Sequence, residues 1–352
     1  MNFLVVSSYP PMRCGIGRYA EQQVAALRAA GHRVDVLSPP EGEGDWHAEL
    51  QGGLRPLRLL WLAWAYEEII IHYTPHFFYG ERSRAGRILT SLAFLLVLLL
   101  SRGRVVFLIH ETSYRLEQAQ CGSRHRIDRW YFRLARRVEF HSKREREVFM
   151  DFYRLHGAAD RLQVVPHERH MAPRCTLNRA EARRALGLPV EAVLLVCLGF
   201  IQPHKGFDRV LEVFARVPGE HLRLKIVGSV RLNWDVAHAY ATELHRLAER
   251  DPRCEVIECF PDDETFDTWI VASDYVVAPY REIWSSSVAA RAKLFGRPMI
   301  ATETGGLREQ LTEGSFTFGS DLELAEILAR IPPTATGAAS GPDTTEVTLE
   351  PA

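Results

Sequence analysis

The chain has 352 residues, more than a single domain usually contains, and this length predicts two domains. Its 47% hydrophobic and 25% charged residues are typical of a soluble globular protein. The net charge of -1 conceals an asymmetry, because residues 1–172 carry 24 basic and 18 acidic side chains, whereas residues 173–352 carry 19 and 26. The basic first half predicts an anionic surface, lipid or substrate as its partner, and random drift between two domains is the alternative.

Three classes of protein are disfavoured by simple features of the sequence. The cysteines are scattered without a C-x-x-C pair, so we interpret them as reduced thiols of a cytoplasmic protein; they are Cys14, Cys121, Cys175, Cys197, Cys254 and Cys259. The first residues have no basic region before the apolar stretch, so no signal peptide is predicted. The longest apolar run, Leu92–Leu100, is about half of the ~20 residues that span a bilayer. It therefore predicts a core helix and not a membrane span.

Strand-like apolar runs alternate with helix-like segments, such as Ala20–Ala30, along most of the chain. The alternation is typical of an α/β protein with parallel sheets covered on both faces. The first series of predicted strands comprises Phe3–Ser7, Arg33–Leu37, Ile69–His72, Val105–Ile109, Val138–Phe140 and Leu162–Val165. The second comprises Ala192–Leu198, Leu222–Val227, Glu255–Glu258, Tyr275–Ala278 and Met299–Ala301.

The two series predict two Rossmann-like domains with a ligand cleft between the carboxyl ends of their strands. The predicted domains are residues 1–172 and 173–331. Residues 332–352 are rich in Pro, Gly, Thr, Ser and Ala, and a disordered tail is predicted there.

The segment Gly199–Asp208 links a predicted buried strand to the helix-like segment Arg209–Ala215. It contains Lys205 and Gly206, and the chain has only four lysines among its 43 basic residues. A lysine in a glycine-bearing loop before a helix can hold a phosphate, because the helix start offers free N–H groups and a partial positive charge. A solvated lysine on a surface turn is the alternative.

A second glycine loop, Cys14–Ala20, opens the first predicted helix. Gly15 and Gly17 would let the backbone approach a phosphate closely. The stretch also fits G-x-G-x-x-A with Asp35 at the end of the next strand, so a nicotinamide-dependent oxidoreductase is an alternative. Against it, the loop Ser8–Arg13 separates the glycines from the strand, whereas the dinucleotide pattern follows its strand at once.

Polar residues follow several other predicted strands, where they would face the cleft. His110 and Glu111 follow Val105–Ile109, and the segment Val165–Glu168 ends the last strand of the first series. Farther on, Ala278–Arg291 runs from a strand end through three serines into a helix, a pattern suited to an anion or sugar hydroxyls. A hydrogen-bonded loop histidine and a hinge turn are the alternatives for the first two.

Taken together, these motifs resemble the retaining glycosyltransferases of family 4, which have the two-domain GT-B fold. The resemblance covers roughly residues 1–330, and its segments occur in the family's order: Tyr9–Ala20, His110, Gly199–Gly206, Ile226–Gly228 and Asp274–Gly306. Each motif is weak alone, but together they are specific.

The resemblance implies a role for each matching residue. The implied catalytic residues are His110, which would contact the donor sugar, Lys205 and Glu282. The implied ligands of the donor phosphates are Gly15, Gly17, Lys205, Ser286, Ser287 and Val288. The nucleotide would lie mainly in the second domain, against Gly228, Tyr280 and Arg291. No metal site and no cofactor are expected, since the substrate itself is a nucleotide diphosphosugar.

Two departures from the family pattern concern the donor site. The family usually has an arginine shortly before its phosphate lysine, where this chain has Phe200. Of the family's two glutamates, the first falls on Ile283, next to Glu282, and the second, which usually holds ribose hydroxyls, falls on Arg291. An altered nucleotide position, or a catalytically degenerate member of the family, therefore remains an alternative.

The predicted function is transfer of a sugar from GDP-mannose or a UDP-sugar to a glycan, a lipid-linked molecule or a small molecule, in surface polysaccharide or glycoconjugate biosynthesis. Arginines alternate with an apolar face in the segment 126–137, formed by Ile127, Trp130, Tyr131 and Leu134. The first interpretation of this pattern is an apolar face that packs into the core, with solvated arginines. Peripheral contact of a cytoplasmic protein with an anionic membrane is the other interpretation. No nucleic-acid partner is expected.

Overall fold

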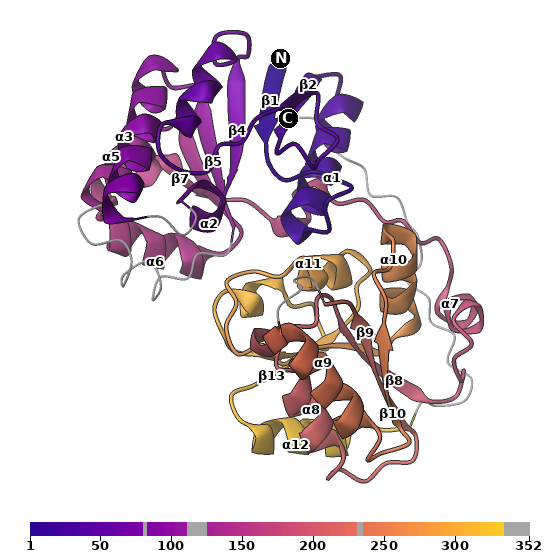
Figure 1. Ribbon diagram of the computed structural model, residues 1–352. Coiled ribbons are helices and arrows are strands. Elements are labelled where there is room, and N and C mark those ends of the chain that lie inside the picture. The colour runs from indigo at the N-terminus through magenta and orange to yellow at the C-terminus, as the bar shows by residue number, and fades with distance from the viewer. Residues whose placement is uncertain (80–82, 111–124, 231–234, 334–352) are drawn as a thin grey trace.

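The computed structural model describes residues 1–79, 83–110, 125–230 and 235–333. These residues form two α/β domains, each built on an all-parallel sheet (Figure 1). The first sheet has the order β3-β2-β1-β4-β5-β6-β7, and the second has the order β10-β9-β8-β11-β12-β13. The predicted tail falls almost wholly outside the described residues.

Every strand predicted from the sequence is present, with small differences at its ends. The first sheet comprises β1 (Asn2–Val6), β2 (Arg33–Ser38), β3 (Trp46–His47), β4 (Glu68–Tyr73), β5 (Val105–Ile109), β6 (Arg137–Phe140) and β7 (Leu162–Val164). The second comprises β8 (Val193–Leu198), β9 (Leu222–Gly228), β10 (Cys254–Glu258), β11 (Tyr275–Ala278), β12 (Met299–Thr302) and β13 (Phe316–Phe318). Two short edge strands, β3 and β13, were not predicted from the sequence.

Helices cover both faces of the first sheet. On one face lies α1 (Gly15–Ala29), whose Ala20 and Val24 pack on β1 and β2. The opposite face carries η1 (Arg55–Trp61), α2 (Pro75–Tyr79), α3 (Arg84–Leu100), α5 (His125–Leu134) and α6 (Lys143–Tyr153). This double cover explains why β4 and β5 are buried along their whole length.

The second sheet is covered in the same way. Here α8 (Phe207–Phe214) packs against α9 (Asp235–Ala248) and α12 (Asp321–Arg330). On the other side, α10 (Asp263–Ala272) packs against α7 (Arg179–Ala185) and α11 (Ser287–Leu294) (Figure 1). Short 3-10 helices complete the described elements: η2 (His156–Arg161), η3 (His167–His170), η4 (Pro203–Lys205) and η5 (Leu307–Gln310).

The prediction of a core helix holds for only one side of the run Leu92–Leu100. The run is helical, as the C-terminal part of α3. Phe94, Val97 and Leu98 are buried, whereas Leu92, Leu96 and Leu99 are exposed. Apolar residues on every side of a helix predict burial, and only the packing around α3 shows that one side has no partner in the described chain.

Specific polar contacts join the two domains. The side chain of Glu309 accepts hydrogen bonds from the backbone N–H groups of Lys143 and Arg144, at 2.8 and 3.1 Å, and so completes the N-terminus of α6. Lys293 of α11 forms an ion pair with Glu168 of η3 at 2.6 Å. These contacts hold the carboxyl ends of the two sheets close to one another.

Candidate functional site

Lys205 lies at the position that the sequence predicted, between β8 and α8. Gly206 follows it in the left-handed conformation, with φ of +65°. A Cβ atom there would lie 2.2 Å from the carbonyl oxygen of Pro279, so this turn requires glycine. The Nζ of Lys205 lies over the ring of Tyr280, 4.1 Å from its centroid. Tyr280 is buried, so its ring is held in place and stabilises the ammonium group of Lys205 by a cation–π contact.

The loops after β8 and β9 approach each other more closely than side chains would permit. A Cβ atom on Gly228 would lie 1.8 Å from the carbonyl oxygen of Gly199. Gly199 has a φ of +114°, which L side chains rarely adopt. Gly199 and Gly228 line the same cavity as Lys205, so the close contact between their two loops forms part of the wall of that cavity.

The predicted serine turn opens α11. Ser286 is the N-cap residue of this helix, and its side chain accepts a hydrogen bond from Ala289 N at 3.4 Å. Its own backbone N–H donates to Gln310 Oε1 at 2.7 Å. Ser287 and Val288 follow in the first turn and line the cleft, where a helix N-terminus favours an anion.

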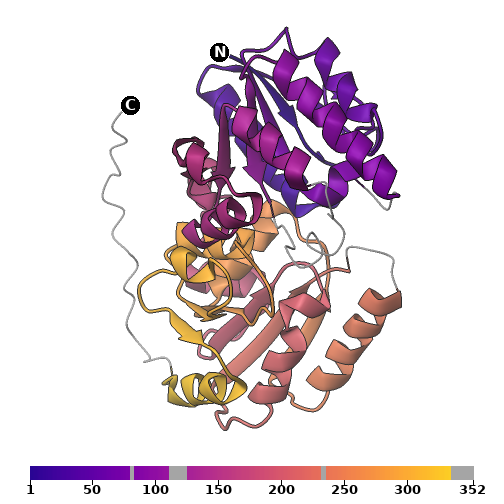
Figure 2. The ribbon, with the colours of Figure 1, turned by 90° about the vertical axis from the view of Figure 1, so that its left-hand side faces the viewer.

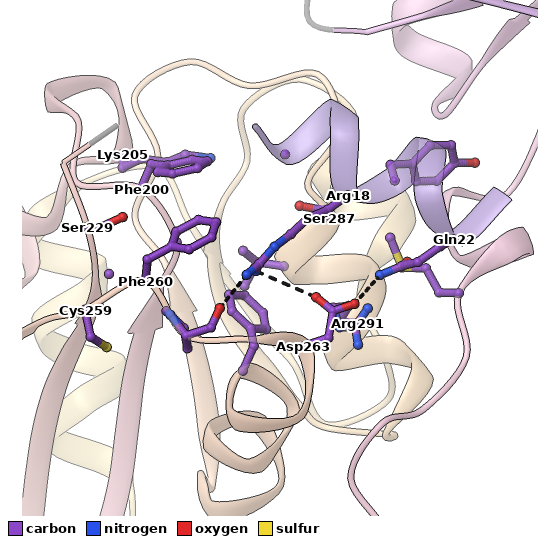
Figure 3. Close-up of a pocket in the computed structure, with 18 residues that line it drawn as sticks. Arg18, Gln22, Phe200, Lys205, Ser229, Cys259, Phe260, Asp263, Ser287 and Arg291 are labelled. Carbon is purple, nitrogen blue, oxygen red and sulfur yellow. Dashed lines mark hydrogen bonds and ion pairs between the residues drawn. The ribbon is translucent and has the colours of Figure 1, made fainter. Parts of the chain in front are cut away.

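These elements line two adjoining cavities between the domains, which together with the solvent-filled space at their mouths measure about 790 and 720 Å³. The two cavities share the lining residues Gly15, Tyr19, Phe200, Lys205 and Ser287. The larger cavity continues past Arg18, Gln22, Gly228, Phe260, Asp263, Val288 and Arg291, most of which Figure 3 labels. The smaller one continues past His110, His167, Gln202 and Ser286. The structure therefore gathers most of the predicted site residues in one cleft.

Arg18 crosses the larger cavity from the first domain to the second (Figure 3). Its guanidinium lies over the ring of Phe260, 4.2 Å from the centroid, and donates a hydrogen bond to the carbonyl oxygen of Pro261 at 2.5 Å. It also pairs with Asp263 at 3.7 Å, and Gln22 donates to the same carboxylate at 2.9 Å. Arg18 thus brings a positive charge into the cavity, although Phe200 occupies the position where the resemblance predicts an arginine.

Two aromatic rings form an apolar wall of the same cavity. Phe200 and Phe260 stack with an interplanar angle of 22° and 5.9 Å between ring centroids. A flat apolar wall beside a cationic loop suits a ligand that has both an aromatic and an anionic part.

Arg291 is held by a carboxylate that the sequence did not single out. Its Nε and one terminal nitrogen donate to the two oxygens of Asp267, at 2.6 and 2.8 Å. Both side chains are buried, and Asp267 also accepts a hydrogen bond from Arg174 N at 2.8 Å. Arg291 lines the cavity, but its charge is balanced by this pair and its strongest donors are already occupied.

His110 forms part of a chain of hydrogen bonds that ends in α1. Its Nε2 lies 3.0 Å from Nδ1 of His72, and Nε2 of His72 lies 2.9 Å from Oε1 of Gln23. Burial lowers the pKa of both histidines, to about 3 for His72, so both are neutral at pH 7. Since Gln23 presents an oxygen, His72 carries its hydrogen on Nε2, and His110 donates from its own Nε2. This arrangement leaves Nδ1 of His110 with a lone pair.

His72 was not predicted as a site residue, although its position in the sequence resembles that of His110. His72 is a polar residue at the end of a predicted strand, like His110, but it falls inside the apolar run instead of after it. Gln23 gave no such signal, because only the packing of α1 on the sheet brings it to His72.

Further histidines surround the ring of Tyr19 at the start of the cleft. His141 and His167 stack with their centroids 4.0 Å apart, and both rings contact Tyr19. Nδ1 of His167 is buried and has no partner among the described residues, and His167 lines the smaller cavity. His170 also contacts Tyr19. Burial lowers the pKa of His141 and of His170 to about 4.

Acidification is expected to destabilise the first domain through these histidines. Unfolded histidine titrates near 6.5, whereas His72 and His141 titrate near 3 and 4 in the fold. From about pH 6.5 down to 4 the unfolded chain binds more protons, so the free energy of unfolding falls as the pH falls. Each histidine contributes a slope of about 1.4 kcal/mol per pH unit in that window. Urea unfolding at pH 7.5, 6.0 and 5.0 measures it.

The matched variants for this measurement are His141→Gln and His156→Gln. The first removes a buried histidine and is expected to flatten the pH dependence. The second removes a histidine that is 65% exposed and is expected to leave the dependence unchanged. A His141→Gln variant with the slope of the natural chain would contradict the prediction.

Other predicted site residues lie at the margin of the cleft or away from it. Tyr280 supports Lys205 and does not line either cavity. Gly17 is buried in α1, where a Cβ atom would lie 3.2 Å from Ser8 O. Glu282 is exposed and lies outside the lining of both cavities, because its neighbour Ile283 turns inward and is buried. Glu111 lies outside the described residues.

Among the described residues, no group of three or more His, Cys, Asp or Glu side chains could hold a metal ion. The expectation that neither a metal nor a cofactor takes part stays a prediction. The cysteines of the described chain, Cys14, Cys175, Cys197, Cys254 and Cys259, are free thiols.

Comparison with known proteins connects this cleft to a family. Residues 192–331 match the family of group 1 glycosyl transferases. A D-inositol 3-phosphate glycosyltransferase of Xylanimonas cellulosilytica is 30% identical over 171 residues, 46% of this chain and 40% of the relative. One from Streptomyces bingchenggensis is 36% identical over 143 residues, 39% of this chain and 31% of the relative. The matches thus span about two fifths or less of these curated relatives.

Solved structures match nearly the whole fold. Sucrose-phosphate synthase from Thermosynechococcus elongatus superposes with a TM-score of 0.69 at 19% identity, over 94% of this chain and 89% of the other. Anabaena HepE, solved in complex with UDP-glucose, superposes with a TM-score of 0.68 at 18% identity, over 93% of this chain and 88% of the other. At such identities the likeness concerns the fold.

The described chain therefore has the GT-B fold of glycosyltransferases, with two Rossmann-like domains and a cleft between them. Its second domain is similar in sequence to group 1 glycosyl transferases over residues 192–331. The resemblance to glycosyltransferase family 4 is thereby confirmed.

Proposed function

We propose that this protein is a retaining glycosyltransferase that transfers a sugar from a nucleotide diphosphosugar without a metal ion. The observation that carries the proposal is the convergence of Lys205, the N-termini of α8 and α11, and an aromatic wall in one cleft. The lysine and the helix ends suit a diphosphate, and the wall suits a base. HepE, a structural neighbour, was solved in complex with UDP-glucose, which supports a donor of this class.

The chemistry follows from where charge develops. As the bond between the anomeric carbon and the diphosphate oxygen breaks, negative charge grows on the diphosphate. Lys205 and the N–H groups of Ser287 and Val288 would stabilise that charge in the transition state. The acceptor oxygen forms its bond on the same face, and its proton passes to the departing phosphate oxygen, so the configuration is retained. His110, neutral and fixed by His72, would hold a hydroxyl of the donor sugar.

The ribose of the nucleotide would meet a different environment from the one that the family pattern implies. Arg291 has no acceptor for ribose hydroxyls, and two of its three nitrogens donate to Asp267. A carboxylate that does line the cavity is Asp263, at the start of α10. We infer that Asp263, held by Arg18 and Gln22, accepts hydrogen bonds from the ribose in place of the missing glutamate.

A further cavity in the first domain, of about 880 Å³, suits the acceptor. Ser7, Ser38, Gln51, His72 and Phe78 are among its lining residues, a mixture of hydroxyl, amide and aromatic groups that suits a sugar or another polyol. The hydroxyl of Ser7 is buried without a partner among the described residues. His72 lines this cavity and His110 lines the donor cleft, so their hydrogen bond joins the two spaces.

The proposed acceptor is a glycan, a lipid-linked molecule or a small molecule, and the proposed process is the synthesis of surface polysaccharides or glycoconjugates. We also propose a cytoplasmic protein that touches the inner face of the membrane. Among the described residues, no helix combines the length and the apolar character needed to cross a bilayer. The amphipathic segment named from the sequence is α5, and Tyr131 of its apolar face is buried in the core, whereas Trp130 is exposed.

A thermal-shift screen against UDP, GDP, UDP-glucose, GDP-mannose and NAD tests the donor. One nucleotide class is expected to raise the melting temperature, because a ligand that binds only the folded state stabilises it by mass action. At a concentration 100 times the dissociation constant the gain is about 2.7 kcal/mol. Transfer of the radiolabelled sugar to water or to an acceptor, with release of the nucleoside diphosphate, then tests the activity.

Each other outcome has a definite meaning. Stabilisation by NAD alone would replace the transferase with the nicotinamide-dependent oxidoreductase. Binding of a nucleotide without release of sugar, or no binding at all, would favour a catalytically degenerate member, and the Arg291–Asp267 pair would be its cause.

A further inference from the structure

The outer side of α3 carries an uninterrupted row of exposed leucines. Leu89, Leu92, Leu96 and Leu99 recur at the spacing of one helical face, and together with Leu100 they are 41–56% exposed. We call these residues the leucine face. Over its 17 residues α3 is about 25 Å long, so the row extends well beyond an isolated apolar contact. A monomeric protein rarely leaves such a row in contact with water.

The opposite side of α3 cannot turn outward to hide the leucines. Phe94, Val97 and Leu98 pack in the core of the first domain. The hydroxyl of Ser91 donates to the buried carboxylate of Asp128 in α5, and Thr90 accepts a hydrogen bond from Gly53 N at 2.8 Å. These contacts fix the rotation of the helix, so the leucine face is a constant feature of the surface.

Tryptophans border the leucine face on both sides. Trp61 and Trp64 lie in and just after η1, which packs along α3, and Trp130 lies on α5, which packs along its other side. All three are about half exposed. Tryptophan on an exposed surface is typical of the boundary between water and a bilayer, where its ring is apolar and its N–H is hydrated.

Arginines occupy both ends of the same surface. The segment 83–104 contains four arginines, Arg84, Arg87, Arg102 and Arg104, and no acidic residue. Arg102 and Arg104 lie over the ring of Trp64, at 5.0 and 5.2 Å from its centroid. We call these four residues the arginine rim. A rim of one sign around an apolar face is complementary to an anionic surface with an apolar interior.

We propose that the leucine face and the arginine rim dock this protein on an anionic lipid bilayer, with α3 lying parallel to the membrane; this rests on the membrane contact proposed above and gives it a defined surface. Leucine side chains would enter the boundary between headgroups and acyl chains, and the arginines would pair with anionic headgroups. In Figure 1, α3 lies on the side of the first domain opposite α1; Figure 2 views that side, and the second domain does not cover these helices. Docking through α3 would therefore leave the cleft and the second domain uncovered.

A second copy of the chain fits this surface less well. In a two-fold dimer the same patch contacts itself, so the arginine rims of two molecules would face each other. The segment 83–104 offers no carboxylate to pair with them, and neither does the segment 52–66, which contains Trp61 and Trp64. An anionic bilayer removes this repulsion.

Flotation of the full chain with lipid vesicles tests the proposal. We expect the protein to float with vesicles that contain phosphatidylglycerol and not with pure phosphatidylcholine, and to bind less at high salt, which screens the arginines. The triple variant Leu92→Gln, Leu96→Gln, Leu99→Gln is expected to lower the bound fraction at least tenfold. The matched control is Leu322→Gln, which replaces a leucine that is 71% exposed on α12 of the second domain and is expected to change nothing.

A second variant tests the contribution of the arginine rim and does not depend on whether the leucine variant folds. The double variant Arg84→Gln, Arg102→Gln is expected to weaken binding to anionic vesicles several-fold, and it decides the question even if the triple variant does not fold. Absence of flotation of the natural chain, or equal flotation of the variants, would overturn the proposal. So would a leucine-dependent dimer in light scattering without flotation. The nucleotide thermal shift does not involve these residues, so donor binding and membrane docking can fail independently.

Discussion

Replacement of Lys205 by alanine is expected to lower the turnover of sugar transfer about 10²- to 10³-fold, the usual loss when one group that stabilises a developing anion is removed. The lysine is the cation that precedes α8, and its turn is fixed by Gly206 and by the buried ring of Tyr280. The fold should survive, since the side chain contributes one cation–π contact worth about 0.5–1 kcal/mol. Steady-state release of the nucleoside diphosphate measures the change.

The matched control is Lys225→Ala. Lys225 lies on β9 of the same domain, where it pairs with Glu255 and lines neither cavity of the cleft. Its removal is expected to leave turnover within about twofold of the natural chain, because surface ion pairs contribute little. A Lys205→Ala protein with near-normal turnover would remove the lysine from the mechanism and, with it, the central argument for the donor site.

Replacement of Asp267 by alanine is expected to destabilise the second domain by about 3–5 kcal/mol, because it leaves the buried guanidinium of Arg291 without a counter-charge. Asp267 has no exposed surface and accepts hydrogen bonds from Nε and one terminal nitrogen of Arg291, together with the backbone N–H of Arg174. Urea unfolding followed by circular dichroism measures the loss. An unchanged unfolding midpoint would show that the pair carries no such energy.

A double variant distinguishes the effect of the unpaired charge of Arg291 from the effect of the volume lost with the Asp267 side chain. In the double variant Asp267→Leu, Arg291→Met no charge remains buried, so most of the stability should return. The exposed pair Glu243 and Arg246 is the control, and Glu243→Ala should leave the midpoint unchanged.

Arg291→Glu, which would restore the residue of the family pattern, is expected to lower stability. It would place two carboxylates side by side in a buried site, and one of them would have to take up a proton. The arginine is therefore part of the local structure of this chain and cannot be exchanged alone.

The positions of most strands along the chain, and of the glycine-bearing loops that follow them, could be read from the sequence. Runs such as Val105–Ile109 and Tyr275–Ala278 are apolar because both faces of their sheets are covered, and that pattern is local. The glycines around Lys205 are likewise local signals, since a turn with a positive φ favours glycine. These features were enough to predict the two sheets and the loops that line the cleft between them.

The remaining features depend on which surfaces meet. Asp267 neutralises Arg291 only because α10 packs against α11, and Arg18 reaches Phe260 only because the two domains face each other. The bond from His72 to His110 joins neighbouring strands that are far apart in the chain. The leucines of α3 were predicted to be core residues because they are apolar. Their hydrophobicity does not indicate whether another part of the chain covers them. Only the packing of the other elements around α3 determines that one face of this helix is exposed to solvent.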